Sequence, residues 1–418
     1  MPHDHSLTDG SRRHEEGEAE MADPGPRNPF TDPSGVLSRL SRRRFLGLAG
    51  GTAAAGLLTA CGLGNSSSNS TPKPGGASQS LAPVGGDLNL YVWQGYDVPD
   101  DFKTWLKQEG ITEHVKYITQ PEEVPTVLKG PGGDKWDMSY GDNVVLDYYK
   151  QLGLLTPMTV EQVPGLNGLM PAFQVAPWKN DDGTYNGVPW TWGFSGLTYR
   201  VGAVPEPQSW QDILDPKYKG RVSTVDGATN NVGLASIAVG IDPDTMTTAQ
   251  LQGPIKDWLL KLKSQIRALA PSIGDQISLL VSGDVDYMVV GLTFMDAVAA
   301  KKGVKTKTIA PSEGALGWAD TTFITPSAPN PQNAYAFANH LLDPETNASA
   351  NSGLQQGPGV QASIPMLSAE TKALYPFDDI DNYLQNTLTF NRGWPHQPEG
   401  DRATYDQVIQ TWEEVKGS

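Results

Sequence analysis

Aromatic side chains are the residues of this chain best suited to bind a ligand. Most tryptophans and several tyrosines lie where an expected strand ends and a loop begins. In open α/β sheets ligands bind beyond the carboxyl ends of the strands, so rings at these positions can form the walls of a cleft. We expect a ligand-facing role above all for Trp93 and Trp318, each close to a polar residue. The full set is Trp93, Tyr96, Trp136, Tyr140, Trp190, Trp192, Trp318 and Trp394.

Residue patterns typical of catalysis or metal binding are missing from the sequence. The histidines that follow residue 15 are His114, His340 and His396, which are far apart and form no zinc-binding spacing. Ser195 lies in Gly-Phe-Ser-Gly, one position away from a G-x-S-x-G nucleophile motif. No Walker A or dinucleotide-binding sequence occurs. We therefore expect a protein that is not an enzyme and that needs no metal or cofactor.

Alternating strands and helices must position the aromatic residues. The order strand, helix, strand, helix predicts parallel βαβ units and an α/β fold. Residues 87–418 are too many to fold around a single hydrophobic core, so we expect two lobes, with the chain crossing between them more than once. The expected strands are 87–93, 114–118, 136–140, 221–225 and 286–290, and the expected helices are 100–109, 144–151, 231–239, 251–264, 294–301, 333–342 and 405–415.

The N-terminal segment has the features of an export signal. Arg42, Arg43 and Arg44 precede an uncharged segment that ends at Ala60, a pattern typical of twin-arginine signals. This segment is shorter than the ~20 apolar residues that span a bilayer. Leu-Thr-Ala-Cys61 resembles the lipobox of bacterial lipoproteins, in which the cysteine is acylated. We expect residues 1–60 to be a removable signal, 61–85 a flexible tether, and the protein to be lipid-anchored at the outer face of the cytoplasmic membrane.

Charge and cysteine content narrow the choice of partners. The net charge is −16, which disfavours nucleic acid as a partner. It favours cationic solutes only weakly, because solubility explains it equally well. Cys61 is the single cysteine, so a disulfide within a monomer is impossible, and an unmodified buried thiol is the alternative to lipidation. We expect a monomer that meets the membrane through its lipid anchor alone.

Several motifs occur in the order found in a known family. Residues 90–96 carry a W-x-x-Y pair, and 210–220 read W-x-D-I-L-D-P-x-Y-K-G. Together with three further segments they resemble the bacterial spermidine/putrescine-binding proteins, the receptors of polyamine ABC importers. The resemblance covers nearly all of residues 86–418. The further segments are Trp136–Met138, Gly187–Gly193 and Gly314–Asp320.

The resemblance implies a two-lobed periplasmic-binding-protein fold with a hinge between the lobes. One lobe would hold residues 86–196 and 322–365, and the other 197–321 and 366–418. The ligand would lie in the cleft between them, and hinge closure would trap it. The partner would be an ABC permease in the membrane, which recognises the closed form.

The resemblance also implies which residues bind the ligand. Asp320 takes the role of central carboxylate and Asp226 that of a second one, because burying an unpaired cation costs several kcal/mol. Trp93, Tyr96 and Trp318 supply walls for methylenes and ammonium groups. Asp142 provides a third carboxylate or, alternatively, the N-cap of the following helix.

The sequence departs from the family at several ligand positions. Thr229, with Asn230 beside it, replaces an acidic residue, and Gly291, Gly357 and Pro395 replace a tryptophan, a tyrosine and a glutamine. We therefore expect a roomier cleft and a small cation or amine, of which spermidine and putrescine are the family examples.

Two other functions are compatible with these residues. The same type of receptor could carry an opine, an amino sugar or another polar metabolite, because tryptophan-lined clefts also bind sugar faces. A secreted hydrolase could use Asp226 and Asp320 as a carboxylate pair. The sequence lacks the flanking catalytic signatures that this hydrolase would need.

Overall fold

The computed structural model describes residues 83–119 and 123–418. The expected signal segment 1–60, the lipidation site Cys61 and most of the expected tether lie outside these residues. No helix in the described part combines the length and the apolar character needed to cross a membrane.

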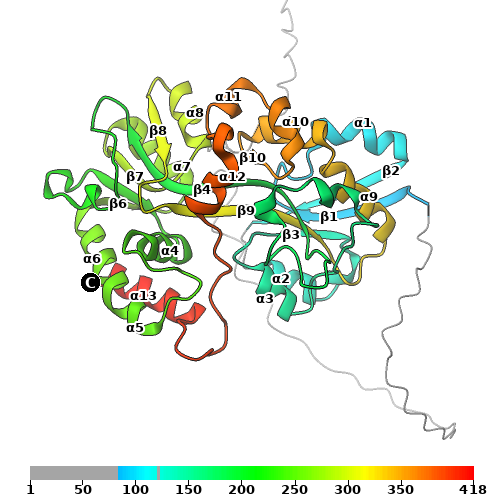
Figure 1. Cartoon of the computed structure of the whole chain (residues 1–418), viewed down its shortest axis with the longest axis horizontal. Coiled ribbons are helices and arrows are strands. Elements are labelled where there is room, and N and C mark those ends of the chain that lie inside the picture. Colours follow the sequence, from blue (N-terminus) through cyan, green and yellow to red (C-terminus); the bar gives the residue numbers. More distant parts are fainter. Residues whose placement is uncertain (1–82, 120–122) are drawn as a thin grey trace, which may run out of the picture. The chain divides into compact units, whose positions relative to one another are not determined.

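A single mixed sheet of eleven strands runs through the described part (Figure 1). Its main order is β2-β1-β3-β9-β4-β7-β5-β6, and β8, β10 and β11 pair off this path. The strands are β1 (Gly86–Val92), β2 (Ile111–Tyr117), β3 (Met138–Gly141), β4 (Val188–Arg200), β5 (Val222–Val225), β6 (Ile266–Ala270), β7 (Tyr287–Leu292), β8 (Thr306–Ile309), β9 (Ala315–Ile324), β10 (Gly357–Pro358) and β11 (Leu388–Thr389).

Parallel pairs flank an antiparallel centre. Strand β1 pairs in parallel with β2 and β3, and β5 pairs in parallel with β6 and β7, as the βαβ pattern predicts. Between these groups the long strands β4 and β9 pair antiparallel. The strands expected from the sequence lie in these parallel groups and are confirmed. The two central strands, β4 and β9, were not predicted.

Helices cover the sheet, and their ends follow local sequence signals. Thr404 and Gln407 form a capping box at the start of α13. The expected single helix 251–264 is wrong, because Gly253 and Pro254 interrupt it with a π-helical turn before α6. The helices are α1 (Pro99–Glu109), α2 (Glu123–Lys129), α3 (Leu146–Gln151), α4 (Ala228–Ala238), α5 (Thr248–Gln250), α6 (Lys256–Gln265), α7 (Ile273–Ser282), α8 (Phe294–Lys301), α9 (Pro331–Leu341), α10 (Pro344–Leu354), α11 (Ala369–Lys372), α12 (Ile380–Asn386) and α13 (Tyr405–Gly417).

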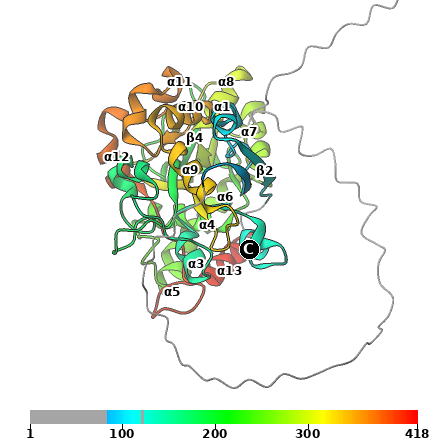
Figure 2. The ribbon, with the colours of Figure 1, turned by 90° about the vertical axis from the view of Figure 1, so that its right-hand side faces the viewer.

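Two large hydrophobic cores lie on either side of the central strands. The first core holds β1–β3, α9 and the start of β4, and the second holds α4, α6, α13 and the end of β4. Along β4, Phe194 packs in the first core and Leu197 in the second. Helix α13 packs on α4 and α6 (Figures 1 and 2). Strand β4 therefore crosses from one core to the other.

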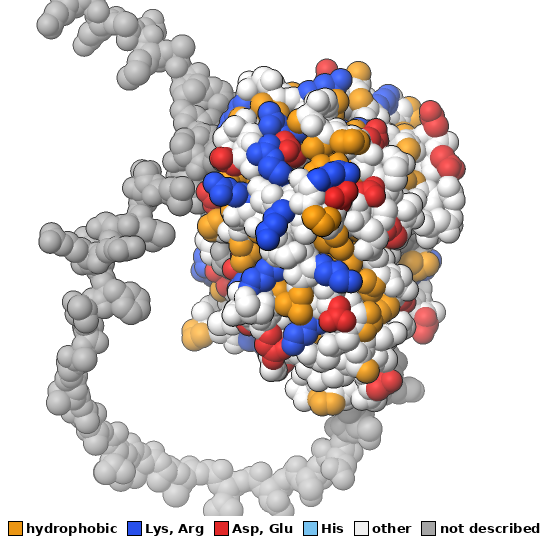
Figure 3. Space-filling view, turned by 90° about the vertical axis from the view of Figure 1, so that its left-hand side faces the viewer, with side chains coloured by type: hydrophobic (Ala, Val, Ile, Leu, Met, Phe, Trp, Pro, Cys, Tyr) orange, Lys and Arg blue, Asp and Glu red, His pale blue; other side chains and the backbone are white. Residues whose placement is uncertain are grey.

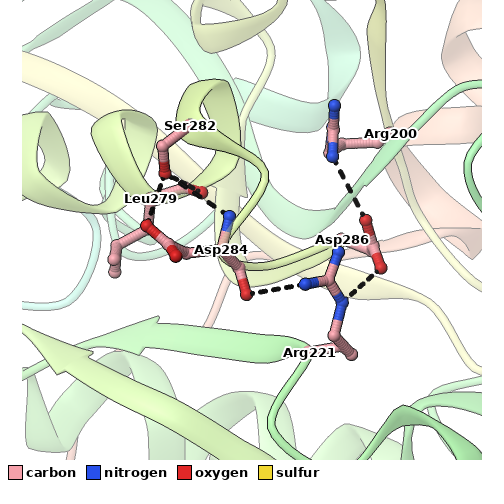
Figure 4. A network of polar contacts seen from close by, with 6 residues as sticks. All are labelled: Arg200, Arg221, Leu279, Ser282, Asp284 and Asp286. Carbon is pink, nitrogen blue, oxygen red and sulfur yellow. Dashed lines mark hydrogen bonds and ion pairs between the residues drawn. The ribbon is translucent and has the colours of Figure 1, made fainter.

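A polar network holds the strand ends of the second core together (Figure 4). Asp286, at the start of β7, is 7% exposed and accepts a 2.7 Å hydrogen bond from Arg221 Nε. Arg200, at the end of β4, lies 3.5 Å from the same carboxylate. Arg221 also donates to the backbone carbonyl of Asp284. The buried charge of Asp286 is thus compensated, as burial requires.

Charges of both signs occur on the face shown in Figure 3. Lysine and arginine side chains lie among aspartate, glutamate and apolar side chains there. This face therefore carries basic as well as acidic side chains, although the net charge of the chain is −16.

Candidate functional site

Two tyrosines hold the buried carboxylate of Asp320. Asp320 lies in β9 and is 8% exposed. The Tyr140 hydroxyl donates a 2.8 Å hydrogen bond to its Oδ1, and the Tyr96 hydroxyl donates to its Oδ2. Burial raises the pKa of Asp320 to about 7, Asp142 adds to this effect, and the tyrosine hydrogen bonds oppose it. The site thus contains a carboxyl group that can change its charge near neutral pH.

Aromatic rings pack around these hydroxyl groups. Tyr96 contacts Tyr140 and Trp190 edge-on, with ring centroids 5.9 and 5.0 Å apart respectively. Trp93 contacts Tyr140 in the same manner at 5.6 Å. The structure therefore brings Trp93 and Tyr96, predicted from the W-x-x-Y pair, close to Asp320, predicted from the segment Gly314–Asp320.

A cavity of about 430 Å³ lies next to this cluster. It is bounded by residues from α2, α3, α4, β4 and β9 and from the segment between β11 and α13. Its size is in the range of sites for small ligands. The lining residues are Pro125, Thr126, Tyr140, Asp142, Val144, Val145, Tyr148, Tyr149, Ser195, Thr229, Asn230, Leu316, Gly317, Trp318, Asn391, Trp394, His396 and Tyr405.

Of the residues proposed as ligand-binding from the family motifs, Asp142, Thr229 and Trp318 line the cavity directly. Asp142 follows β3 and is partly buried, and its carboxylate accepts a 3.0 Å hydrogen bond from the Val144 backbone N–H. It thus orders the turn before α3 while it borders the cavity. Trp318 packs on Gly193, where an added Cβ would lie 2.2 Å from the indole ring. Thr229 lies in the first turn of α4.

Asp226 is engaged away from the cavity. Its carboxylate accepts a 2.8 Å hydrogen bond from Trp412 Nε1 and pairs with Lys416 Nζ at 3.1 Å. Asp226 does not line the cavity. Trp93, Tyr96 and Asp320 do not line it either, but all three contact Tyr140, which does. A ligand-binding role of Asp226 stays a prediction that requires release of its ion pair.

The expectation of a cleft widened by glycines is wrong. A Cβ at Gly357 would lie 2.1 Å from the Trp192 ring, and one at Gly291 would lie 2.0 Å from Thr198 Oγ1. These neighbouring side chains occupy the space that a larger residue would fill. Neither glycine lines the cavity.

Sequence reasoning missed an aromatic stack at the cavity. The His396 ring stacks on Tyr148 at 3.6 Å and on Tyr405 at 4.7 Å between centroids. Partial burial lowers the pKa of His396, so the ring is neutral at neutral pH. The nearby Trp394 was among the aromatic candidates predicted from the sequence. The sequence contains no signal, however, that places His396 between Tyr148 of α3 and Tyr405 of α13. Among the described residues no group of acidic, histidine or cysteine side chains could hold a metal ion.

Comparison with known proteins identifies relatives along most of the chain. The family model described as "Bacterial extracellular solute-binding protein" matches residues 133–378. The putrescine-binding periplasmic protein PotF of Escherichia coli is 26% identical over 324 residues, which are 72% of this chain and 86% of that protein. Spermidine/putrescine-binding periplasmic protein 1 of Haemophilus influenzae is 25% identical over 347 residues, 81% of this chain and 92% of the relative.

A solved structure establishes the fold. The spermidine/putrescine substrate-binding protein PotD of Streptococcus pneumoniae superimposes with a TM-score of 0.68 and 22% identity, covering 79% of this chain and 99% of that one. The expected two-lobed periplasmic-binding-protein fold of the α/β class is thereby confirmed. These relatives give no support to a secreted hydrolase, and the prediction of a protein without enzyme activity is confirmed. The chain belongs to the bacterial extracellular solute-binding proteins.

Proposed function

We propose that this protein captures a small polyamine-like cation or amine and presents it to the permease of an ABC importer. The observation that carries this proposal is the pair of carboxyl groups at an aromatic cavity. Asp142 borders the cavity, and Asp320 lies behind Tyr140. Relatives in E. coli and H. influenzae are named for binding putrescine and spermidine. The proposed ligand residues are Trp93, Tyr96, Asp142, Asp226, Thr229, Trp318 and Asp320.

The physical basis of binding is charge compensation inside a partly dehydrated cavity. An ammonium group next to Asp142 gains a carboxylate partner, and rings such as Trp318 contribute about 0.5–2 kcal/mol per cation–π contact. Cation binding also favours the ionised form of Asp320. An opine or amino sugar remains the second candidate, because the cavity also carries the neutral polar side chains Ser195, Thr229 and Asn230.

Two lobes that close over the ligand form part of the proposal. The hydrophobic cores support the expected lobes 86–196 plus 322–365 and 197–321 plus 366–418, with one adjustment. Tyr375, Ile380 and Leu388 pack in the first core, so this part of the C-terminal segment moves with the first lobe. We also propose that a lipid on Cys61 anchors the protein at the outer face of the cytoplasmic membrane and that the protein acts as a monomer.

Titration calorimetry of the full chain tests the cargo. We expect one-site binding of at least one of 1,4-diaminobutane, spermidine and 4-amino-1-butanol. Asp142→Asn should weaken that binding by about 2–5 kcal/mol, as expected for loss of one member of a desolvated charge pair. Asp181→Asn is the matched control, because Asp181 is exposed and outside the cavity. Failure of all three amines to bind would contradict the cationic cargo.

A further inference from the structure

The charged side chains around the 430 Å³ cavity are distributed unevenly. Of the described residues that line it, Asp142 is the one carboxylate, and Asp320 lies behind Tyr140 on the same side. The side formed by β4 and α4 carries Ser195, Thr229 and Asn230, which are uncharged. The cavity can therefore compensate an ammonium group at one end but not at the other.

Nearby carboxylates do not supply the second charge. Asp226 is held by Lys416 and Trp412. A neighbouring cavity of about 550 Å³ shares Val144, Tyr148, Trp394 and His396 with the first one. Its charged residues are balanced, since it contributes three acids and three bases. These are Asp147, Asp244, Glu399, Lys150, Arg392 and Arg402.

Ion pairs neutralise two of the three acids of this second cavity. Arg392 Nη2 lies 2.6 Å from Asp147, and Arg402 Nη1 lies 2.7 Å from Glu399. Asp244 accepts a 2.6 Å hydrogen bond from the backbone N–H of Arg392. A diamine that reached into this cavity would have to compete with arginines already in place.

Three lining residues carry buried N–H groups that lack a partner among the described residues. They are the indole Nε1 of Trp318, the indole Nε1 of Trp394 and the amide Nδ2 of Asn391. A buried donor without a partner is destabilising, and an acceptor oxygen that reaches it removes this penalty. An ammonium group has no acceptor atom, whereas a hydroxyl or carbonyl oxygen accepts hydrogen bonds.

We propose that the cavity selects an amine with a single ammonium group and an uncharged, oxygen-bearing opposite end. The inference rests on the proposed function, because it takes the ammonium group to lie near Asp142 and Asp320. The neutral end would face Ser195, Thr229 and Asn230, whose hydroxyl and amide groups can hydrogen-bond an uncharged oxygen. A bare diamine has a second cation in place of that oxygen.

Two probes of equal length test this selectivity on the full chain. 1,4-Diaminobutane and 4-amino-1-butanol share a four-carbon spacer and differ in one terminal group. By titration calorimetry at pH 7.5, we expect the amino alcohol to bind about 10- to 100-fold more tightly, because an ammonium buried without a carboxylate is costly.

A charge added at the neutral end should reverse the preference. Asn230→Asp keeps the shape of the side chain and places a carboxylate in the first turn of α4, where the helix dipole tolerates it. We expect the ratio of the two affinities to shift by about 10-fold or more toward 1,4-diaminobutane. Asn386→Asp on α12 adds the same charge at an exposed position outside the cavity and should leave the ratio unchanged.

The outcomes separate this inference from the proposed function. If wild-type protein binds 1,4-diaminobutane as tightly as the amino alcohol or more tightly, the inference is overturned and an amine receptor remains. If the folded protein binds neither probe, the inference is overturned; the proposed function is overturned as well only if spermidine also fails to bind. A preference for the amino alcohol that Asn230→Asp does not shift would also overturn the inference, because the neutral end would then lie elsewhere.

Discussion

Asp320 shows how one residue links cavity chemistry to pH. Its carboxyl group receives two tyrosine hydrogen bonds, yet burial still raises its pKa to about 7 from an ordinary value of 3.8. The folded chain therefore retains a proton that the unfolded chain releases at lower pH. By linkage, this group reduces stability as the pH rises from about 4 to 7, with a slope of at most about 1.4 kcal/mol per pH unit.

We expect Asp320→Asn to remove this contribution. Thermal unfolding of the ligand-free protein between pH 5 and 8 should show wild type losing stability relative to the variant as the pH rises. Comparison with the variant is needed because Glu113 also has a raised pKa, of about 7. Parallel pH profiles of the two proteins would contradict the assignment.

Amine binding should have the opposite pH dependence. A bound ammonium group favours ionised Asp320, so affinity is expected to increase as the pH rises through about 7. Calorimetry at pH 6 and 8 measures the change in affinity. The same titrations in buffers of different ionisation enthalpy should reveal release of a proton on binding, and Asp320→Asn should abolish that release.

At the scale of elements, the segment between β11 and α13 connects both cores at the cavity. Arg392 pairs with Asp147 in α3, while His396 stacks between Tyr148 in α3 and Tyr405 at the start of α13. The ion pair is partly exposed, with Arg392 46% accessible, so it contributes at most about 1 kcal/mol. Each aromatic stack contributes about 0.5–1.5 kcal/mol beyond its buried area.

His396→Ala should therefore weaken amine binding more than Arg392→Gln does. We expect a loss of about 3- to 30-fold for the histidine variant, and His396→Phe should retain most of the affinity because its ring can still stack. Calorimetric titration measures both changes. His114→Ala is a control at an exposed histidine, and equal losses for His114 and His396 would contradict a specific role of the stack.

At the scale of the whole molecule, export and anchoring depend on residues outside the described part. We expect Cys61→Ala to release the exported protein from the membrane fraction, because acyl chains stabilise membrane binding by about 0.8 kcal/mol per buried methylene. Cell fractionation with immunodetection measures the distribution. Lysine in place of both Arg42 and Arg43 should instead block export, which distinguishes loss of the anchor from loss of the signal. Retention of Cys61→Ala at the membrane would contradict lipid anchoring.

The sequence by itself determined the α/β class, the parallel strands of both halves and the family motifs. These features depend on local periodicity and on residue order, both of which can be read along one chain. Trp93, Tyr96 and Asp320 could be predicted as neighbours because the family resemblance assigns all three to the ligand, and in the structure β3 lies between β1 and β9.

Only the tertiary structure decided which side chains meet at the cavity. The Trp192 ring beside Gly357 and the Thr198 side chain beside Gly291 fill the space that sequence reasoning left empty, and Lys416 from α13 pairs with Asp226. His396 lies in the long segment between β11 and α13, whose sequence has no periodic pattern that would predict its place at the cavity. Such contacts join residues far apart in the chain, and their energies depend on packing and burial, which exist only once the lobes have folded.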